Sequence, residues 1–193
     1  MLQLHLRRAS RPTLPCLILL TAGWFGACAS PRTETGAQPA GTVLTDANIA
    51  SIASTANTGE IQTANLALAE TSNPAVRRFA QQMLSDHTEA NRRLAAVVGN
   101  LDIQPAPTPT TRQLETNTGR AMESLQARSG TDFDRMYIAN QIEQHRWLLQ
   151  TLDGALIPSA RHRRMEDYLR WLRATVASHL SQAQQVQQSL GGG

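Results

Sequence analysis

Apolar residues recur at three- and four-residue steps along most of this chain, which is the pattern of amphipathic helices. The clearest stretch lies between residues 74 and 98. Its stripe consists of Val76, Phe79, Ala80, Met83, Ala90, Leu94 and Val97. Pro74 suits a first helical position, and Ser72 or Asn73 before it can cap the open N–H groups. We therefore expect a long helix here that ends near Gly99 and Asn100.

Three further long helices follow from the same periodicity, and no alternating run of β-branched residues predicts a strand. The predicted long helices cover residues 45–70, 74–100, 131–156 and 159–190. A short amphipathic helix over about 111–127 follows the proline-rich segment 105–110, which cannot be helical. Thr45 or Asp46 can cap the first helix, and Pro158 closes the third long one. The fold class predicted is all-α.

Three of the long helices place a histidine inside the apolar stripe, namely His87, His145 and His179. A buried imidazole destabilises a core unless its ring nitrogens find partners. The remaining long helix contributes Glu60, near the edge of its apolar face. His162 is out of phase with its helix and is expected at the surface. Glu60 and the three histidines can form a single site if the topology brings them to the same level of the bundle.

The linker between the second and third long helices decides that level. With short connections throughout, His179 would lie about 12 Å away from the level of the other three groups. If residues 100–130 instead cross the whole length of the bundle, all four groups fall into one layer. Antiparallel neighbours need only about 2–8 connecting residues, so this long linker favours the crossover. The prediction is a ferritin-like four-helix bundle whose long crossover carries a short extra helix.

The sequence also resembles a family, the bacterial DUF4142 domain of predicted outer-membrane proteins, over roughly residues 44–190. The resemblance rests on LALAE after Glu60, FAQQMLSDHTEANRRL around His87, FDRMYIANQIEQH ending at His145, and LRATVASHLSQA around His179. It implies a ferritin-like fold and no particular activity.

The histidine layer predicts a metal site different from a di-iron centre. Ferritin-like di-iron sites use Glu-x-x-His pairs, but the residues three before these histidines are apolar, namely Leu84, Ile142 and Val176. Three imidazoles with Glu60 suit one divalent transition metal such as zinc, iron, nickel or copper. Asp86 and Gln141 are candidate hydrogen-bond partners of the ligands. No catalytic residue is predicted, and oxidoreductase-type metal chemistry stays open.

Two classes of function fit this pattern. In the first, the bundle binds a metal through Glu60, His87, His145 and His179, for storage, sensing or stress protection in the cell envelope. In the second, the same residues form a metal-free hydrogen-bonded cluster that specifies the fold, while the outer faces bind a protein partner. The sequence contains no nucleophile–base pair and no nucleotide-binding loop, which disfavours a hydrolase or a kinase.

The charge pattern limits the kinds of partner that the protein is expected to bind. The chain has 18 Lys or Arg residues and 15 acidic ones, and every cation is an arginine. Arg7, Arg8 and Arg11 belong to the N-terminal leader, so the rest of the chain is close to neutral and shows no basic stripe for nucleic acid. The absence of lysine excludes Schiff-base chemistry.

Residues 1–27 have the plan of a lipoprotein-type signal peptide: arginines, then an apolar run, then small residues. Phe25-Gly26-Ala27-Cys28 resembles the lipobox of bacterial lipoproteins. It implies that Cys28 is lipidated, and Ala29 after it implies an outer-membrane anchor facing the periplasm. The alternative is simple cleavage before Ser30 and secretion into the periplasm. Residues 28–44 are rich in Pro, Gly and Thr and are expected to be a flexible tether to a domain over 45–190.

Overall fold

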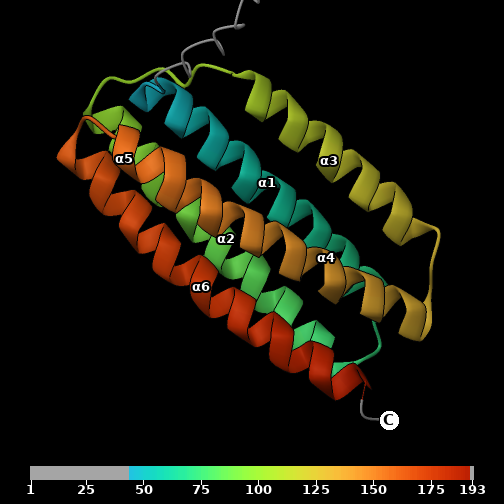
Figure 1. Cartoon of the computed structure of the whole chain (residues 1–193). Helices are drawn as coiled ribbons and strands as arrows, with labels where there is room; N and C mark the ends of the chain where they lie inside the picture. Colours follow the sequence, from blue (N-terminus) through green and yellow to red (C-terminus); the bar gives the residue numbers. More distant parts are fainter. Residues whose placement is uncertain (1–43, 192–193) are drawn as a thin grey trace, which may run out of the picture. The chain divides into compact units, whose positions relative to one another are not determined.

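The computed structural model describes residues 44–191. The predicted leader, Cys28 and the tether up to residue 43 lie outside the described residues. Within 44–191 the chain is helical and contains no strand, which confirms the all-α prediction (Figure 1). The helices are α1 (Asp46–Glu70), α2 (Pro74–Asn100), α3 (Pro109–Gln126), α4 (Gly130–Thr151), α5 (Ile157–Ser159) and α6 (Arg163–Gly191). A π-helical turn, η1 (Leu152–Leu156), joins α4 to α5.

Short polar residues fix where the first three helices begin. The Thr45 side chain accepts from the Asn48 N–H and forms a capping box with it at the start of α1. Asn73 caps α2 directly before Pro74, and Thr108 caps α3 in the same way directly before Pro109. Of the caps proposed from sequence, Thr45 and Asn73 are therefore the ones used.

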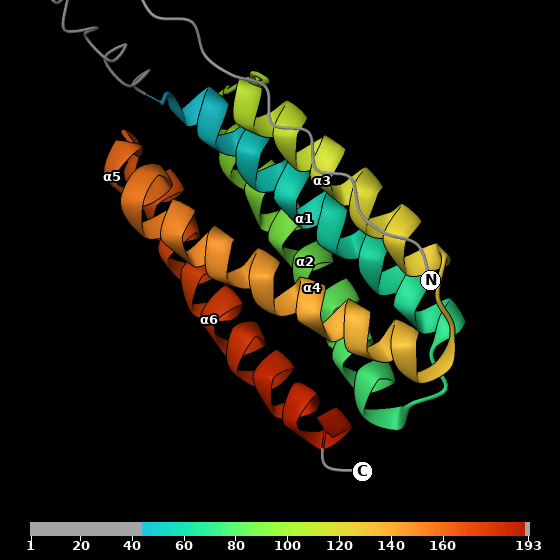
Figure 2. The ribbon, with the colours of Figure 1, turned by 45° about the vertical axis from the view of Figure 1, so that its right-hand side comes forward.

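The crossover topology is present. The α1–α2 hairpin is followed by α3, which runs back along α1, so α4 begins beside the α1–α2 turn and runs parallel to α2 (Figures 1 and 2). Thr71 in that turn donates to Asp134 near the start of α4, and the far end of α6 returns to Arg135 through the Leu190 carbonyl. The molecule is a ferritin-like four-helix bundle with a long crossover that carries a short extra helix.

The core consists of two apolar clusters separated by a polar layer. One cluster includes Ile49, Ile52, Leu94, Leu148, Leu169 and Leu172, and the other Phe79, Met83, Phe133, Tyr137, Ile138 and Ala183. Between the two clusters, α1, α2, α4 and α6 contribute buried polar residues, among them Asn57, Glu60, His87, Gln141, His145 and His179. The polar layer thus crosses the middle of the bundle.

Two helix boundaries differ from the predictions. The regular α-helix ends at Thr151, before the predicted end at Leu156, because Pro158 has no N–H and its ring would collide with the Gly154 carbonyl in a regular helix. The last helix starts at Arg163 rather than Ser159. Asp46 accepts from the backbone N–H groups of Arg161 and His162, and it holds these residues outside the helix.

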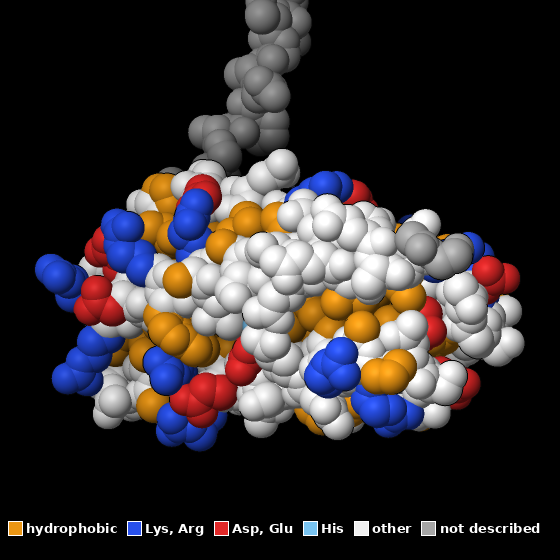
Figure 3. All heavy atoms as spheres, turned by 90° about the horizontal axis from the view of Figure 1, so that it is seen from below, with side chains coloured by type: hydrophobic (Ala, Val, Ile, Leu, Met, Phe, Trp, Pro, Cys, Tyr) orange, Lys and Arg blue, Asp and Glu red, His pale blue; other side chains and the backbone are white. Residues whose placement is uncertain are grey.

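The surface mixes charges of both signs. On the face drawn in Figure 3, arginine and acidic side chains alternate, and apolar atoms show between them. None of the helices in residues 44–191 is long and apolar enough to cross a lipid bilayer.

Candidate metal centre

Three helices deliver one histidine each to the centre of the polar layer. His87 on α2, His145 on α4 and His179 on α6 are at most 1% exposed. Their ring centroids lie 5.3–5.8 Å apart. One nitrogen from each ring lies within 4.8 Å of one nitrogen from each of the others. The crossover therefore brings together the three histidines that the helical periodicity singled out.

Each histidine bonds outward through one ring nitrogen to an oxygen. His87 Nδ1 lies 3.1 Å from Asn57 Oδ1, and His145 Nδ1 lies 2.8 Å from its own helix's Gln141 carbonyl. His179 Nε2 lies 2.9 Å from Asp86 Oδ2. Carbonyl and carboxylate oxygens only accept, so each of these nitrogens carries the hydrogen and donates it. The opposite nitrogen of each neutral ring then bears a lone pair.

Those opposite nitrogens are the ones left without partners. Within the described residues, His87 Nε2, His145 Nε2 and His179 Nδ1 are buried and accept no hydrogen bond. Because the donating nitrogens bond outward, these three atoms are the ones available to a ligand inside the cluster. A metal ion binds an imidazole through a free lone pair, and a hydrogen bond at the other ring nitrogen fixes the tautomer that offers it. All three histidines meet both conditions.

The electrostatics keep the His87 and His179 rings uncharged. Burial lowers the pKa of His87 well below its ordinary value, and the proximity of His145 and His179 lowers it further. Burial also lowers the pKa of His179, although the hydrogen bond to Asp86 acts in the opposite direction. Protons therefore compete less for the lone pairs of His87 and His179 than they would for that of a histidine in water.

Glu60 lies beside the three-histidine group. Its Oε2 accepts from Gln141 Nε2 at 2.9 Å, and its Oε1 lies 3.9 Å from His145 Nδ1, the donating nitrogen. Glu60 is thus placed behind the His145 ring, on the side away from the free lone pair. Gln141 contacts both residues: its side-chain amide donates to Glu60, and its backbone carbonyl accepts from His145.

Beyond Glu60, on α4, lies Tyr137, whose hydroxyl is buried without a partner among the described residues, as is the Gln141 Oε1. Burial raises the Tyr137 pKa well above its ordinary value, and the Glu60 charge adds to this, so the phenol stays neutral.

The remaining predicted positions are placed as follows. Asp86 contacts His179 across the α2–α6 interface rather than its sequence neighbour His87, and its side chain is 36% exposed. His162 lies at the end of the bundle against Asp46, with 53% of its side chain exposed, away from the cluster. Sequence reasoning missed Asn57, the partner of His87. The available signal was an asparagine one turn before Glu60 on the buried face of α1.

The fold and the three converging histidines make this protein a ferritin-like helical bundle with a candidate metal centre in its core. The chain belongs to the DUF4142 family, described as a domain of unknown function, whose sequence profile matches residues 30–186. No curated protein shows significant sequence similarity to the chain.

Two solved structures share the fold. A DUF305 protein from Streptomyces coelicolor, considered to be secreted, superposes with a TM-score of 0.65 and 13% identity, covering 76% of this chain and 93% of that one. CopM in its Cu(II)-bound form superposes with a TM-score of 0.60 and 16% identity, covering 76% of this chain and 98% of CopM. At these identities the likeness concerns the fold alone.

Proposed function

We propose that this protein binds one divalent transition metal ion through His87, His145 and His179 in the core of the bundle. The observation that carries the proposal is the set of three buried, unpartnered ring nitrogens on three different helices. Buried polar atoms are almost always satisfied, so three exceptions at one place require an explanation.

A metal-free cluster explains these nitrogens less well than a metal. Each free nitrogen is an acceptor, so a metal-free core would need three donors at this point. One water molecule has only two hydrogens and would leave a lone pair unpaired. A cation can accept all three lone pairs at once, and imidazole is a good ligand for zinc, copper, nickel and iron.

The two carboxylates balance the charge of such an ion. Asp86 hydrogen-bonds the His179 ring, and Glu60 lies 3.9 Å from the His145 ring. Two negative charges beside three neutral imidazoles offset a charge of +2, whose burial alone is strongly unfavourable. We assign Glu60 and Asp86 this role and keep the three histidines as the direct ligands. When bound, the ion would supply Lewis-acid chemistry or, for copper or iron, one-electron chemistry.

The test uses each of the metals that three imidazole ligands suit. CopM, which shares the fold, has been solved in its Cu(II)-bound form, and this supports including copper beside zinc, nickel and iron. A metal that binds only the folded state at about 100 times its dissociation constant stabilises it by about 2.7 kcal/mol. For a domain of this size, the melting temperature should rise by roughly 5–10 °C.

The histidine variants separate the two classes of function. Replacing His87, His145 or His179 with Ala should remove most of the metal-induced shift, while His162→Ala, outside the cluster, should keep it. Elemental analysis of protein purified from its native source identifies the ion. If metal-stripped protein melts at one temperature with and without every metal of the panel, the metal-free cluster is the correct interpretation.

We place the protein in the bacterial cell envelope, anchored to the outer membrane through a lipid on Cys28. The support is the leader pattern of residues 1–27 with the Phe25-Gly26-Ala27-Cys28 motif. Mature protein should partition into detergent, and Cys28→Ser should release it. An intact mass for an unmodified chain that begins at Ser30 would instead establish simple secretion.

A further inference from the structure

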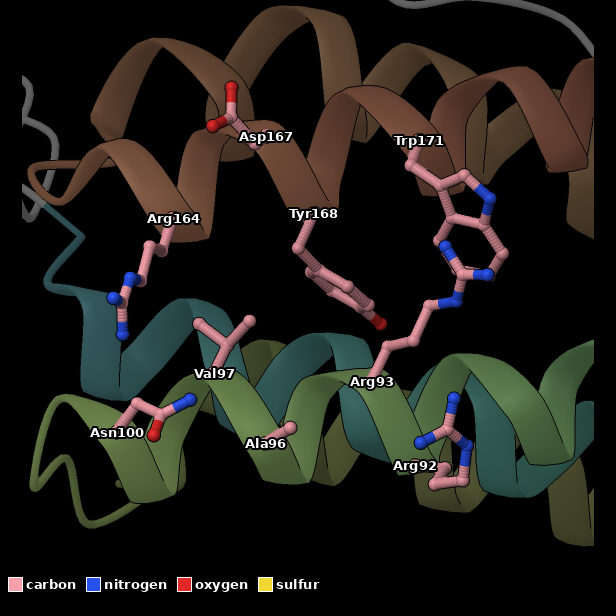
Figure 4. Close-up of a pocket in the computed structure, with 9 residues that line it drawn as sticks. All are labelled: Arg92, Arg93, Ala96, Val97, Asn100, Arg164, Asp167, Tyr168 and Trp171. Carbon is pink, nitrogen blue, oxygen red and sulfur yellow. The ribbon is translucent and has the colours of Figure 1, made fainter.

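A second candidate site lies outside the polar layer, in a groove between α2 and α6. The groove has a volume of about 640 Å³, within the range of small-molecule sites. Its principal lining residues are Arg92, Arg93, Val97, Arg164, Tyr168 and Trp171 (Figure 4). Arginines stand toward both ends, and apolar and aromatic side chains lie between them.

Arg93 is held in place before any ligand arrives. Its guanidinium carbon lies 4.1 Å from the centroid of the Trp171 ring, and its Nε donates to Glu89 at 2.8 Å. The two terminal nitrogens make no hydrogen bond within the described residues. The planar fork that binds carboxylates is therefore oriented by one face and one edge, with its outer edge free.

The groove carries surplus positive charge. Arg92 and Arg93 share the single carboxylate of Glu89, and their hydrogen bonds lower the Glu89 pKa to about 2. Arg164, at the opposite end, has no carboxylate within 4.0 Å in residues 44–191. Asp167 also borders the groove, but its carboxylate turns away from the floor in Figure 4 and pairs with Arg163. An anion is thus the complementary ligand.

The middle of the groove suits a flat apolar body. Val97 and the Tyr168 ring form the floor and wall, and Tyr168 lies beside Trp171 with ring centroids 6.1 Å apart. The Tyr168 hydroxyl accepts from Asn57 Nδ2 at 3.2 Å, so its polar end points into the core and its ring borders the groove. Aromatic walls of this kind bind planar apolar groups.

We propose that this groove binds a small organic acid, with its carboxylate on the Arg93 fork and its planar apolar body against Val97, Tyr168 and Trp171. Nothing in this assignment depends on a metal in the histidine cluster, so it stands or falls separately from the proposed function.

The test is calorimetric titration of the metal-stripped full chain with 2-naphthoate at low ionic strength. We expect saturable one-to-one binding that weakens with added salt. Arg93→Gln should weaken it roughly tenfold or more, and Arg93→Lys should also weaken it because a point charge replaces the fork. The matched control is Arg146→Gln, since Arg146 is likewise an exposed arginine paired with a glutamate of its own helix, outside the groove.

Two comparison ligands test the carboxylate and the apolar body of the proposed ligand separately. Acetate lacks the apolar body, and 2-naphthylmethanol lacks the charge, so both should bind at least tenfold more weakly than 2-naphthoate. The proposal is overturned if 2-naphthoate does not bind at millimolar concentration, if folded Arg93→Gln binds it as tightly as the unmodified chain, or if the uncharged alcohol binds equally well.

Discussion

Each histidine of the cluster is oriented by a different kind of oxygen: the side-chain amide of Asn57, the backbone carbonyl of Gln141, and the carboxylate of Asp86. The Gln141 contact comes with the helix itself, because a carbonyl four residues earlier is always near. The other two partners come from neighbouring helices: Asn57 on α1 contacts His87 on α2, and Asp86 on α2 contacts His179 on α6. Substitution of an orienting partner should therefore affect the site without removing a ligand.

Asn57→Ala is the first prediction. Without Asn57 Oδ1, the His87 ring loses the acceptor that fixes its tautomer and its orientation, so metal affinity should fall 10–100-fold. Competition with a chromophoric chelator measures this. Asn91→Ala is the control, because Asn91 contacts the Asn57 amide nitrogen and makes no bond to His87. Equal affinity of Asn57→Ala and the unmodified protein would contradict the assigned role.

Asp46 supports the second prediction, which concerns pH. Burial alone would raise the Asp46 pKa, but hydrogen bonds from Arg161 and His162 lower it below its ordinary value of 3.8. A carboxyl group whose pKa is lower in the folded state stabilises that state above its unfolded pKa, and this contribution is lost as pH falls below it.

Asp46→Asn should therefore destabilise the protein at pH 7, by about 1–3 kcal/mol for lost hydrogen bonds to a charged group. The difference from the unmodified protein should shrink as pH falls below about 3.8. Urea unfolding at several pH values measures it. A difference that is constant from pH 7 to pH 3 would show that the Asp46 charge does not contribute.

At the scale of helices, close approach between α1 and α3 determines how the crossover packs. A Cβ on Gly59 would lie 2.5 Å from Thr118 Oγ1, well inside van der Waals contact. Gly59 precedes Glu60, so the side of α1 that faces the crossover helix lies next to the polar layer. Thr111, Leu114, Thr118 and Leu125 are the buried residues that α3 contributes.

Gly59→Ala is the third prediction. Steric overlap should cost about 1–3 kcal/mol, which exceeds the roughly 1 kcal/mol that alanine contributes to helix stability over glycine. The substitution should therefore lower the free energy of unfolding. In a Thr118→Ala background the overlap is removed, and the same substitution should become stabilising. If its sign does not depend on residue 118, close packing of α3 on α1 is not what requires this glycine.

At the scale of the whole molecule, the crossover is what aligns the histidines. It allows α4 to run parallel to α2, so that His87 and His145 meet at one level while α6 returns with His179 (Figures 1 and 2). α4 has 22 residues, about 33 Å of helix, which a short linker cannot cross.

Replacing residues 103–128 with a six-residue linker is the fourth prediction. Six extended residues reach at most about 21 Å, so the parallel arrangement cannot form. We expect loss of the cooperative thermal transition and of every metal-induced shift. A control that keeps the linker length but replaces exposed residues of α3, such as Glu115 and Arg120, should retain both. A shortened chain that still binds metal through all three histidines would contradict the crossover's role.

Local sequence patterns were enough to predict the long helices and the phase of their side chains, because periodicity, prolines and caps act locally. His87, His145, His179 and Glu60 were found this way, and the length of the linker was enough to choose the crossover. Local signals cannot show which atoms meet across helices. The packing of the helices against one another is what shows that Asn57 contacts His87, that Asp86 contacts His179, and that Glu60 lies behind His145 rather than among the free nitrogens. The start of α6 was decided in the same way, since Asp46 lies 115 residues before the Arg161 backbone that it binds.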